Sequence, residues 1–193
     1  MNEGIITDPD CTYLLVDGEN IDATLGNGIL GGVRPTPEQR PRWERVREFA
    51  QKIWGIQTKA LFFLNASSGQ LPGPFVQALL AMGYRPVPLS GTPDEKVVDL
   101  AVLKTLEALK DRPGNIILAS HDADFATAVC NLINGKRRVA VLGFKEFMSA
   151  QYREMELKGL EIHDLEIHAK AFNVGLPRVR IIPITEFDPT IFL

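Results

Sequence analysis

The polypeptide has 193 residues, of which 45% are hydrophobic and 23% are charged. This composition suits one domain with a substantial core and excludes a disordered chain. The formal net charge of −3 argues against a general polyanion-binding protein, because such domains are usually strongly basic. No apolar run reaches the roughly 18–20 residues that span a bilayer, and the N-terminus does not resemble a signal peptide. We therefore expect a cytoplasmic protein with no membrane partner and two reduced cysteines.

The first part of the chain predicts a strand, a loop and a helix. Tyr13–Val16 is a short apolar run that ends at Asp17, which is typical of a buried strand. Residues 22–40 are rich in Gly and Pro and predict a long, flexible loop. A helix is expected from Pro41, because apolar residues up to Trp54 recur there at helical spacing.

The middle of the chain continues this alternation. Thr58–Leu64 predicts the second strand, and Pro74–Met82 predicts a helix that Gly83 closes. Arg85–Leu89 predicts a strand at the edge of the sheet, since its two prolines cannot donate ladder hydrogen bonds. The run Thr92-Pro93-Asp94-Glu95 has the form of a capping box, which predicts that the next helix begins there.

The last well-marked elements are the strands Asn115–Ala119 and Val139–Gly143, with a helix over Ala123–Ile133 between them. The apolar runs show no in–out alternation, so both faces of the sheet should be covered. The predicted fold class is therefore α/β, with a three-layer, doubly wound, mostly parallel sheet and helices on both faces.

The pattern weakens after residue 145. We place the domain at residues 10–145 and treat residues 146–193 as a C-terminal extension that packs on the domain or completes it. A short helix is expected within 145–158, and strands over Leu160–His163 and Val179–Ile184. Whether the extension regulates the domain, completes the sheet or forms a homodimer is left open.

Acidic residues directly follow two of the predicted strands. Asp17 ends the first strand, and Asp122 and Asp124 come just after the strand Asn115–Ala119. Ligands bind at the carboxyl ends of strands in doubly wound sheets. A role as helix N-cap explains Asp122 taken alone, but capping does not explain acidic residues at two strand ends.

Asp99 is a third candidate, about one position off the buried stripe of the helix after the capping box. It either leans over the edge of the sheet or is an ordinary solvated helix residue. Carboxylates brought together there would repel one another and raise one another's pKa values. A hard cation such as Mg²⁺ or Mn²⁺ removes this cost, and the resulting site suits attack of water on a phosphodiester.

Three motifs resemble those of the NYN domain, in the LabA-like branch of the PIN-like ribonuclease superfamily. They are Asp17-Gly-Glu-Asn20, Lys96-Val-Val-Asp99 and Ser120-His-Asp122-Ala-Asp124-Phe, followed by Gly135-Lys136 before a strand. The resemblance covers roughly residues 12–145 and implies a PIN-like fold and an Mg²⁺- or Mn²⁺-dependent enzyme that cuts RNA. It implies metal ligands, or residues holding metal-bound water, at Asp17, Asp99, Asp122 and Asp124, with polar supports at Asn20 and Ser120.

Two positions depart from the family, which often has Gly where His121 stands and Ser where Ala123 stands. His121 is interpreted as an extra general base or as a tolerated loop residue. Basic residues are candidate contacts for RNA phosphates, or simply part of a solvated surface. These candidates are Arg34 in the expected loop, Arg42 and Arg45 in the helix, Lys96, and Lys136 and Arg137.

The sequence also allows three alternatives to a metal-dependent ribonuclease. Gly26-Asn-Gly28-Ile-Leu-Gly31 matches G-x-G-x-x-G but lacks the strand–turn–helix context of a dinucleotide site, so a flexible loop over the site is preferred. Asp122-Ala-Asp124 also resembles the D-x-D motif of phosphatases, so a small-molecule phosphatase is one alternative. The other is a non-catalytic module that binds RNA or protein on the same fold, which the acidic net charge favours.

Overall fold

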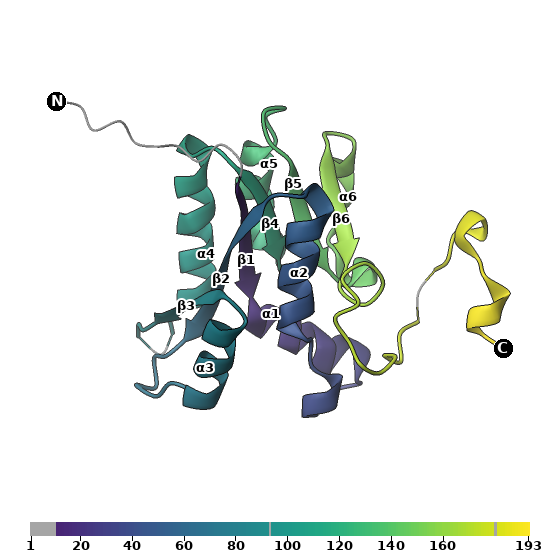
Figure 1. The fold of residues 1–193 in the computed structure, drawn as a ribbon, viewed down its shortest axis with the longest axis horizontal. Coiled ribbons are helices and arrows are strands. Elements are labelled where there is room, and N and C mark those ends of the chain that lie inside the picture. The colour runs from purple at the N-terminus through teal and green to yellow at the C-terminus, as the bar shows by residue number, and fades with distance from the viewer. Residues whose placement is uncertain (1–10, 93, 180) are drawn as a thin grey trace.

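The computed structural model describes residues 11–92, 94–179 and 181–193, which fold around one six-stranded sheet (Figure 1). Neighbouring strands all pair in parallel. In chain order the strands are β1 (Cys11–Asp17), β2 (Gln57–Asn65), β3 (Tyr84–Leu89), β4 (Asn115–Ala119), β5 (Val139–Gly143) and β6 (Leu160–Asp164). Across the sheet their order is β3-β2-β1-β4-β5-β6. The expected parallel α/β sheet is confirmed, and the proline-containing β3 lies at an edge.

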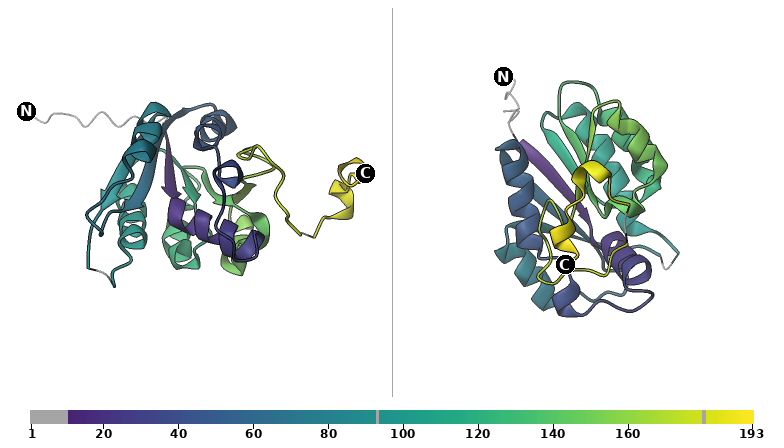
Figure 2. Two further views of the ribbon diagram at one scale, coloured as in Figure 1. Left: turned by 90° about the horizontal axis from the view of Figure 1, so that it is seen from below. Right: turned by 90° about the vertical axis from the view of Figure 1, so that its right-hand side faces the viewer.

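Helices cover both faces of the sheet. They are α1 (Gly18–Ala23), α2 (Trp43–Trp54), α3 (Gly73–Ala81), α4 (Val97–Ala108), α5 (Ala126–Leu132) and α6 (Ala150–Glu156). α2 and α3 pack on one face, whereas α4, α5 and α6 pack on the other, which gives three layers (Figure 2). In the described ranges, no helix is long and apolar enough to cross a bilayer.

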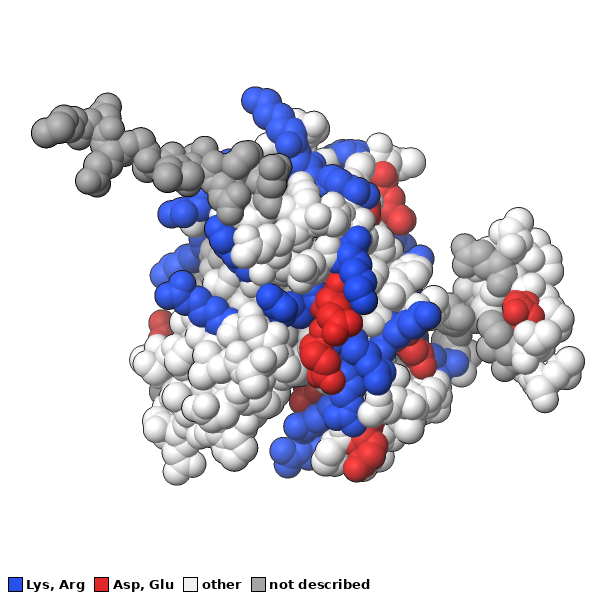
Figure 3. Space-filling model, in the orientation of Figure 1, with Lys and Arg blue, Asp and Glu red and all other residues white. Residues whose placement is uncertain are grey.

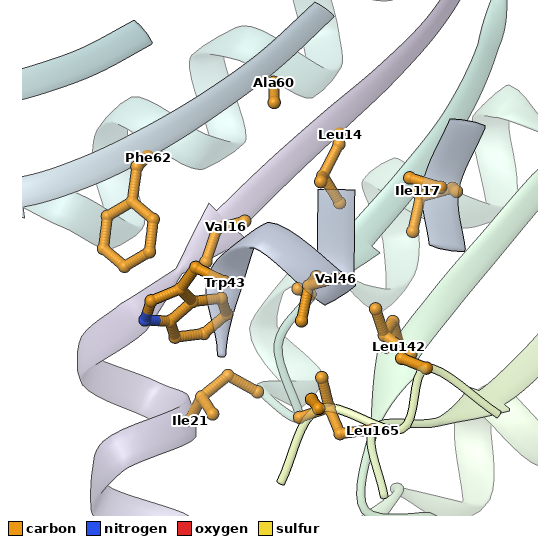
Figure 4. Packing of buried hydrophobic residues seen from close by; sticks show 14 of the residues in the cluster. Leu14, Val16, Ile21, Trp43, Val46, Ala60, Phe62, Ile117, Leu142 and Leu165 are labelled. Atoms are coloured by element: carbon orange, nitrogen blue, oxygen red, sulfur yellow. The ribbon is translucent and has the colours of Figure 1, made fainter. Parts of the chain in front are cut away.

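Side chains on the two faces of β1 pack in two separate parts of the core, because successive side chains of a strand point in opposite directions. Leu14 and Val16 face α2, and Leu15 faces the side of α4 and α5. Trp43, in the first turn of α2, packs edge-on against Phe62 with ring centroids 5.0 Å apart (Figure 4). A strand buried on both sides needs a continuous apolar run, and this is the pattern from which β1 was predicted.

The segment 22–40 differs from the expected long loop, because its first part is helical. α1 runs directly into a π-helix, η1 (Thr24–Ile29). Gly28 of this helix lies so close to Phe147 that an added Cβ would come within 2.6 Å of the ring. The large apolar residues that α1 and η1 bury recur every four positions, at Ile21, Leu25 and Ile29. Much of the G-x-G-x-x-G segment is therefore packed helix rather than a flexible loop.

The start of α4 also differs from the prediction. Thr92 and Glu95 do make the expected contact, in which the Thr92 amide donates to Glu95 Oε2 at 2.8 Å. This contact closes a separate turn, and α4 begins only at Val97. Pro93 lies outside the described residues. The later start places Asp99 in the first turn of α4, where the helix dipole favours a carboxylate.

The chain after β5 completes the sheet and then returns beside α2. β6 pairs with β5 as the last strand, and the backbone of Ala171 later accepts a hydrogen bond from the Arg42 amide at 2.6 Å. Residues 181–193 extend away from the body (Figure 1). The strand expected over 179–184 is wrong for its described residues, which join no sheet and contain Pro183, a residue without an amide donor.

Arg178, in the chain that follows β6, binds three carboxylates and so holds this part of the chain against the domain. Its side chain is 4% exposed and contacts Glu146 at 2.5 Å, Asp164 at 2.5 Å and Glu166 at 2.8 Å. The guanidinium also lies over the ring of Phe144, 5.1 Å from its centroid. Burial alone would raise the pKa of Asp164, but hydrogen bonds from Arg178 and from backbone amides lower it to about 2.

Replacing Arg178 by Ala should lower the free energy of unfolding by about 3–5 kcal/mol, because it leaves buried carboxylates without their cation. The loss should shrink as the pH falls from 3.8 toward 2, since Asp164 then takes up a proton and needs the cation less. Urea unfolding at neutral and acidic pH measures both effects. The exposed Arg112 provides the control variant Arg112→Ala, and equal losses in the two variants would contradict the role given to Arg178.

Candidate acidic active site

The site lies where the order of strands reverses. β1 and β4 are neighbours in the middle of the sheet, and the chain continues from β1 toward one edge and from β4 toward the other. Their register pairs Val16 with Ala119, so Asp17 and Ser120 leave the sheet side by side. Crevices at the carboxyl ends of such strands are the usual ligand sites of doubly wound folds.

Asp17 is the buried centre of this edge, with 1% of its surface exposed. Its two carboxylate oxygens accept hydrogen bonds from neutral donors, the Asn20 amide at 3.2 Å and Ser120 Oγ at 3.0 Å. Burial raises the pKa of Asp17 to about 6, and the negative charges of Asp99 and Glu19 add to the rise against these hydrogen bonds. The site thus holds a carboxyl group whose ionised form is poorly stabilised by the protein.

Asp99 and Glu19 bring negative charge to Asp17 from two helices. Asp99 reaches the edge from α4, with a side chain that is 28% exposed and a salt bridge to Lys96 at 3.5 Å. Glu19 lies in the first turn of α1 and is exposed. Glu19 was not among the residues predicted from the sequence, although its position two residues after Asp17 indicates that it lies near the same edge.

Asp122 and Asp124 follow β4. Asp122 caps the short 3-10 turn η4 (Ala123–Phe125), and its Oδ1 accepts the amide of Asp124 at 2.9 Å. The hydroxyl of Tyr152 in α6 donates to the carbonyl oxygen of Asp122 at 2.5 Å. Burial raises the pKa of Tyr152, and the charges of Asp122, Asp124 and Asp17 raise it further. Tyr152 therefore contacts the backbone of Asp122 and lies near enough to three of the four predicted aspartates for their charges to act on it, although no motif marked it.

His121 is a buried support and not an exposed base. Its Nε2 accepts the amide of Phe144 at 2.7 Å, so Nδ1 carries the proton and faces Asn20 Oδ1 at 3.1 Å. The same Asn20 oxygen accepts the His121 amide at 2.7 Å. Burial lowers the pKa of His121 to about 4. Because both ring nitrogens are engaged, neither the general base nor the tolerated loop residue proposed from the sequence describes this side chain.

The donor set suits a hard divalent cation held by few protein ligands. In the described ranges, no three His, Cys, Asp or Glu side chains are grouped closely enough to hold a metal by themselves. Mg²⁺ usually keeps several waters and binds through only one or two carboxylates, so a larger cluster is not required. Asp17 and Asp99 offer two oxygen ligands, and the charge of Asp99 already raises the pKa of Asp17, an effect that a cation would relieve.

Lys136 and Arg137 do not lie at this edge. Both precede β5, which places them at the amino end of the strands, opposite the aspartates. Arg137 donates there to the carbonyl oxygens of Leu109 at 2.7 Å and Arg112 at 2.6 Å. The structure therefore does not bring these two predicted RNA contacts to the acidic edge.

The other four basic candidates lie nearer the carboxyl edge. Lys96 is beside Asp99, and the exposed Arg34 follows η1 and acts on the charge of Asp22 in α1. Arg42 and Arg45 stand at the start of α2, where both contact the returning segment 170–173. The structure therefore brings Lys96 toward the aspartates and sets Arg42 and Arg45 against a different surface.

These features define a class: a doubly wound α/β protein with an acidic edge at its strand switch point. Residues 12–156 match the family model of the NYN domain, so the chain belongs to the NYN domain family, whose members are generally nucleases. A crystal structure of a protein of unknown function from Vibrio parahaemolyticus is similar, with a TM-score of 0.58 and 16% identity. The match covers 80% of this chain and 93% of that chain and supports the fold alone. No curated protein matches.

Replacing Asp17 by Asn should stabilise the metal-free protein by about 2–3 kcal/mol near neutral pH. The folded pKa of about 6 lies above the ordinary 3.8, so this carboxyl costs no stability below pH 3.8, costs progressively more as the pH rises from 3.8 to 6, and costs the full amount above 6. Urea unfolding in chelator at both extremes measures the difference, with Asp124→Asn as an exposed control. A variant less stable than wild type at neutral pH would show that the carboxylate is well stabilised.

The ring of His121 should stay neutral from about pH 8 to pH 5 in the folded protein, because its pKa is about 4. NMR of the histidine ring protons, assigned with a His121→Gln variant, follows this titration. The urea-unfolded chain is the control, since His121 should titrate there near 6.5. A folded-state midpoint close to the unfolded one would contradict the buried hydrogen-bonded ring.

Proposed function

We propose that this NYN domain is a metal-dependent endoribonuclease of the LabA-like branch, which hydrolyses RNA phosphodiester bonds at the β1–β4 edge. The observation that carries the proposal is Asp17, a buried carboxyl held only by neutral hydrogen-bond donors and surrounded by further negative charge. Such a group is poorly stable as an anion until a cation joins it. Membership in a family of nucleases supports RNA cleavage as the reaction.

Asp17 and Asp99 are the residues proposed to hold Mg²⁺ or Mn²⁺, with Asp122 and Asp124 as further carboxylates from the neighbouring strand end. The chemistry that a bound cation supplies is activation of water and neutralisation of charge on the phosphate. Ser120 orients Asp17 from one side and the Asn20 amide from the other. Tyr152 fixes the backbone of Asp122.

Lys96 is the basic residue best placed to contact a scissile phosphate, since it is exposed and adjacent to Asp99. An exposed salt bridge of this kind contributes little to stability, so the ammonium can exchange one anion for another at small cost. The proposal places the reaction in the cytoplasm, where the free thiols of Cys11 and Cys130 would stay reduced.

One observation favours the alternative of a non-catalytic RNA- or protein-binding module. The Lys96–Asp99 salt bridge puts a cation of the protein next to one of the two carboxylates that the metal would use. A module of this kind would bind RNA equally well with and without Mg²⁺ and would not cut it.

Asp17→Asn and Asp122→Asn should each slow RNA cleavage by about 100-fold or more. Loss of groups that merely support a metal ligand already costs about 10–100-fold, and a direct ligand should matter more. Structured and unstructured labelled RNAs, incubated with Mn²⁺ or Mg²⁺ and resolved on gels, give the rates. Asp111→Asn, an exposed carboxyl before β4 at the opposite edge, is the matched control.

Cleavage by both aspartate variants at the wild-type rate would overturn the ribonuclease proposal. RNA binding that is indifferent to chelator, with no cleavage, would identify the binding module. Turnover of aryl phosphates without RNA cleavage would identify the small-molecule phosphatase.

A further inference from the structure

A second polar surface lies away from the acidic edge, between α2 and the returning segment. It contains a cavity of about 440 Å³. Three cationic side chains line it, Arg45 and Lys52 from α2 and Lys170 from the returning segment, against one carboxylate, Glu48. Figure 3 shows Lys and Arg side chains gathered beside Asp and Glu on the face where α2 lies. A cavity of this size lies within the range that holds a small ligand, which is roughly 300–1,000 Å³.

The guanidinium of Arg45 is held by three hydrogen bonds. It donates to the carbonyl oxygens of Lys170 at 3.1 Å and Phe172 at 3.2 Å, and to Asn173 Oδ1 at 2.8 Å. All three acceptors are neutral, so they hold the guanidinium in place without cancelling its charge. A fixed cation at the wall of a cavity is prepared for an anion, because little ordering remains to be done on binding.

Among the described residues that line the cavity, Glu48 is the only carboxylate, and it forms a salt bridge with Lys52. Their salt bridge spans 3.4 Å between side chains that are 77% and 61% exposed. Solvated pairs of this type contribute about 0–1 kcal/mol, so Lys52 is free to turn toward a stronger anion.

Lys170 adopts an unusual backbone conformation. Its φ is 49°, and in the described part of the chain it is the only residue other than glycine with a positive φ. Left-handed conformations are disfavoured for residues with a Cβ, and such strain concentrates at functional sites. In this conformation the carbonyl oxygen of Lys170 accepts a hydrogen bond from Arg45, and the residue lines the cavity. A glycine at this position would be less strained, but the chain has a lysine there.

We propose that this cavity binds a nucleotide, with its phosphate among Arg45, Lys52 and Lys170 and its base against Phe49. Phe49 lines the same cavity, is half-buried, and is held edge-on by His163 with ring centroids 5.4 Å apart. Aromatic rings beside cationic groups are the elements that bind single-stranded nucleic acid without sequence preference. The nucleotide belongs either to an RNA strand or to a free mononucleotide, and neither case requires cleavage or a metal.

The test compares Lys52→Ala/Lys170→Gly with wild type and with the control Lys110→Ala, an exposed lysine just after α4, which packs on the other face of the sheet. Glycine suits the positive φ of residue 170, so the double variant should keep its fold, which its thermal midpoint verifies. One arm titrates a fluorescein-labelled oligouridylate of about 12 nucleotides in chelator, by anisotropy over a series of salt concentrations. The other arm titrates adenosine 5′-monophosphate, by calorimetry.

In the double variant, RNA should bind at least about fivefold more weakly, and the slope of log K against log salt should fall by about 1.4 for two lost ammonium groups. A loss confined to the mononucleotide arm would also support the cavity and assign it to a free nucleotide. Affinities equal to those of Lys110→Ala in both arms would overturn the inference. Because chelator prevents metal-dependent cutting, this result is independent of the cleavage assay.

Discussion

The hydrogen bond between Ser120 and Asp17 joins two strand ends that are 103 residues apart in the sequence. It exists because β1 and β4 are paired in parallel at the point where the strand order reverses. The same hydroxyl oxygen accepts the amide of Asp122 at 3.2 Å. One side chain therefore sets the separation of the buried Asp17 from the capping Asp122, and changes in the pairing of these two strands would move both carboxylates.

The sequence contained enough information for most of the fold and for the placement of Asp17 and Ser120 at the carboxyl edge. Continuous apolar runs marked the buried strands, and an acidic residue directly after such a run is carried to the carboxyl edge by the strand itself. This reasoning works for Asp17 and for Ser120 because the backbone positions them. The position of Asp99 depends on where α4 begins. The Thr92–Glu95 motif does not reveal that start, because the same hydrogen bonds can close a turn or begin a helix.

Other features could not be read from local patterns. Lys136 lies before β5 and therefore at the amino edge, and the charge of a basic cluster does not by itself show at which edge the cluster lies. The helical character of 22–29 was hidden by its glycines, although apolar residues recurred at helical spacing. Arg178 and Tyr152 act through contacts across many intervening residues, which no local motif encodes.

The acidic edge and the α2 cavity carry charge of opposite sign, since three cations and one carboxylate line the cavity. After burial, the charges that raise the pKa of Asp17 are those of Asp99 and Glu19, both negative. Holding a phosphate at α2 and neutralising Asp17 at the β1–β4 edge are therefore separate tasks. The first is met by lysines and arginine of the chain, and the second leaves a place that a divalent cation fits.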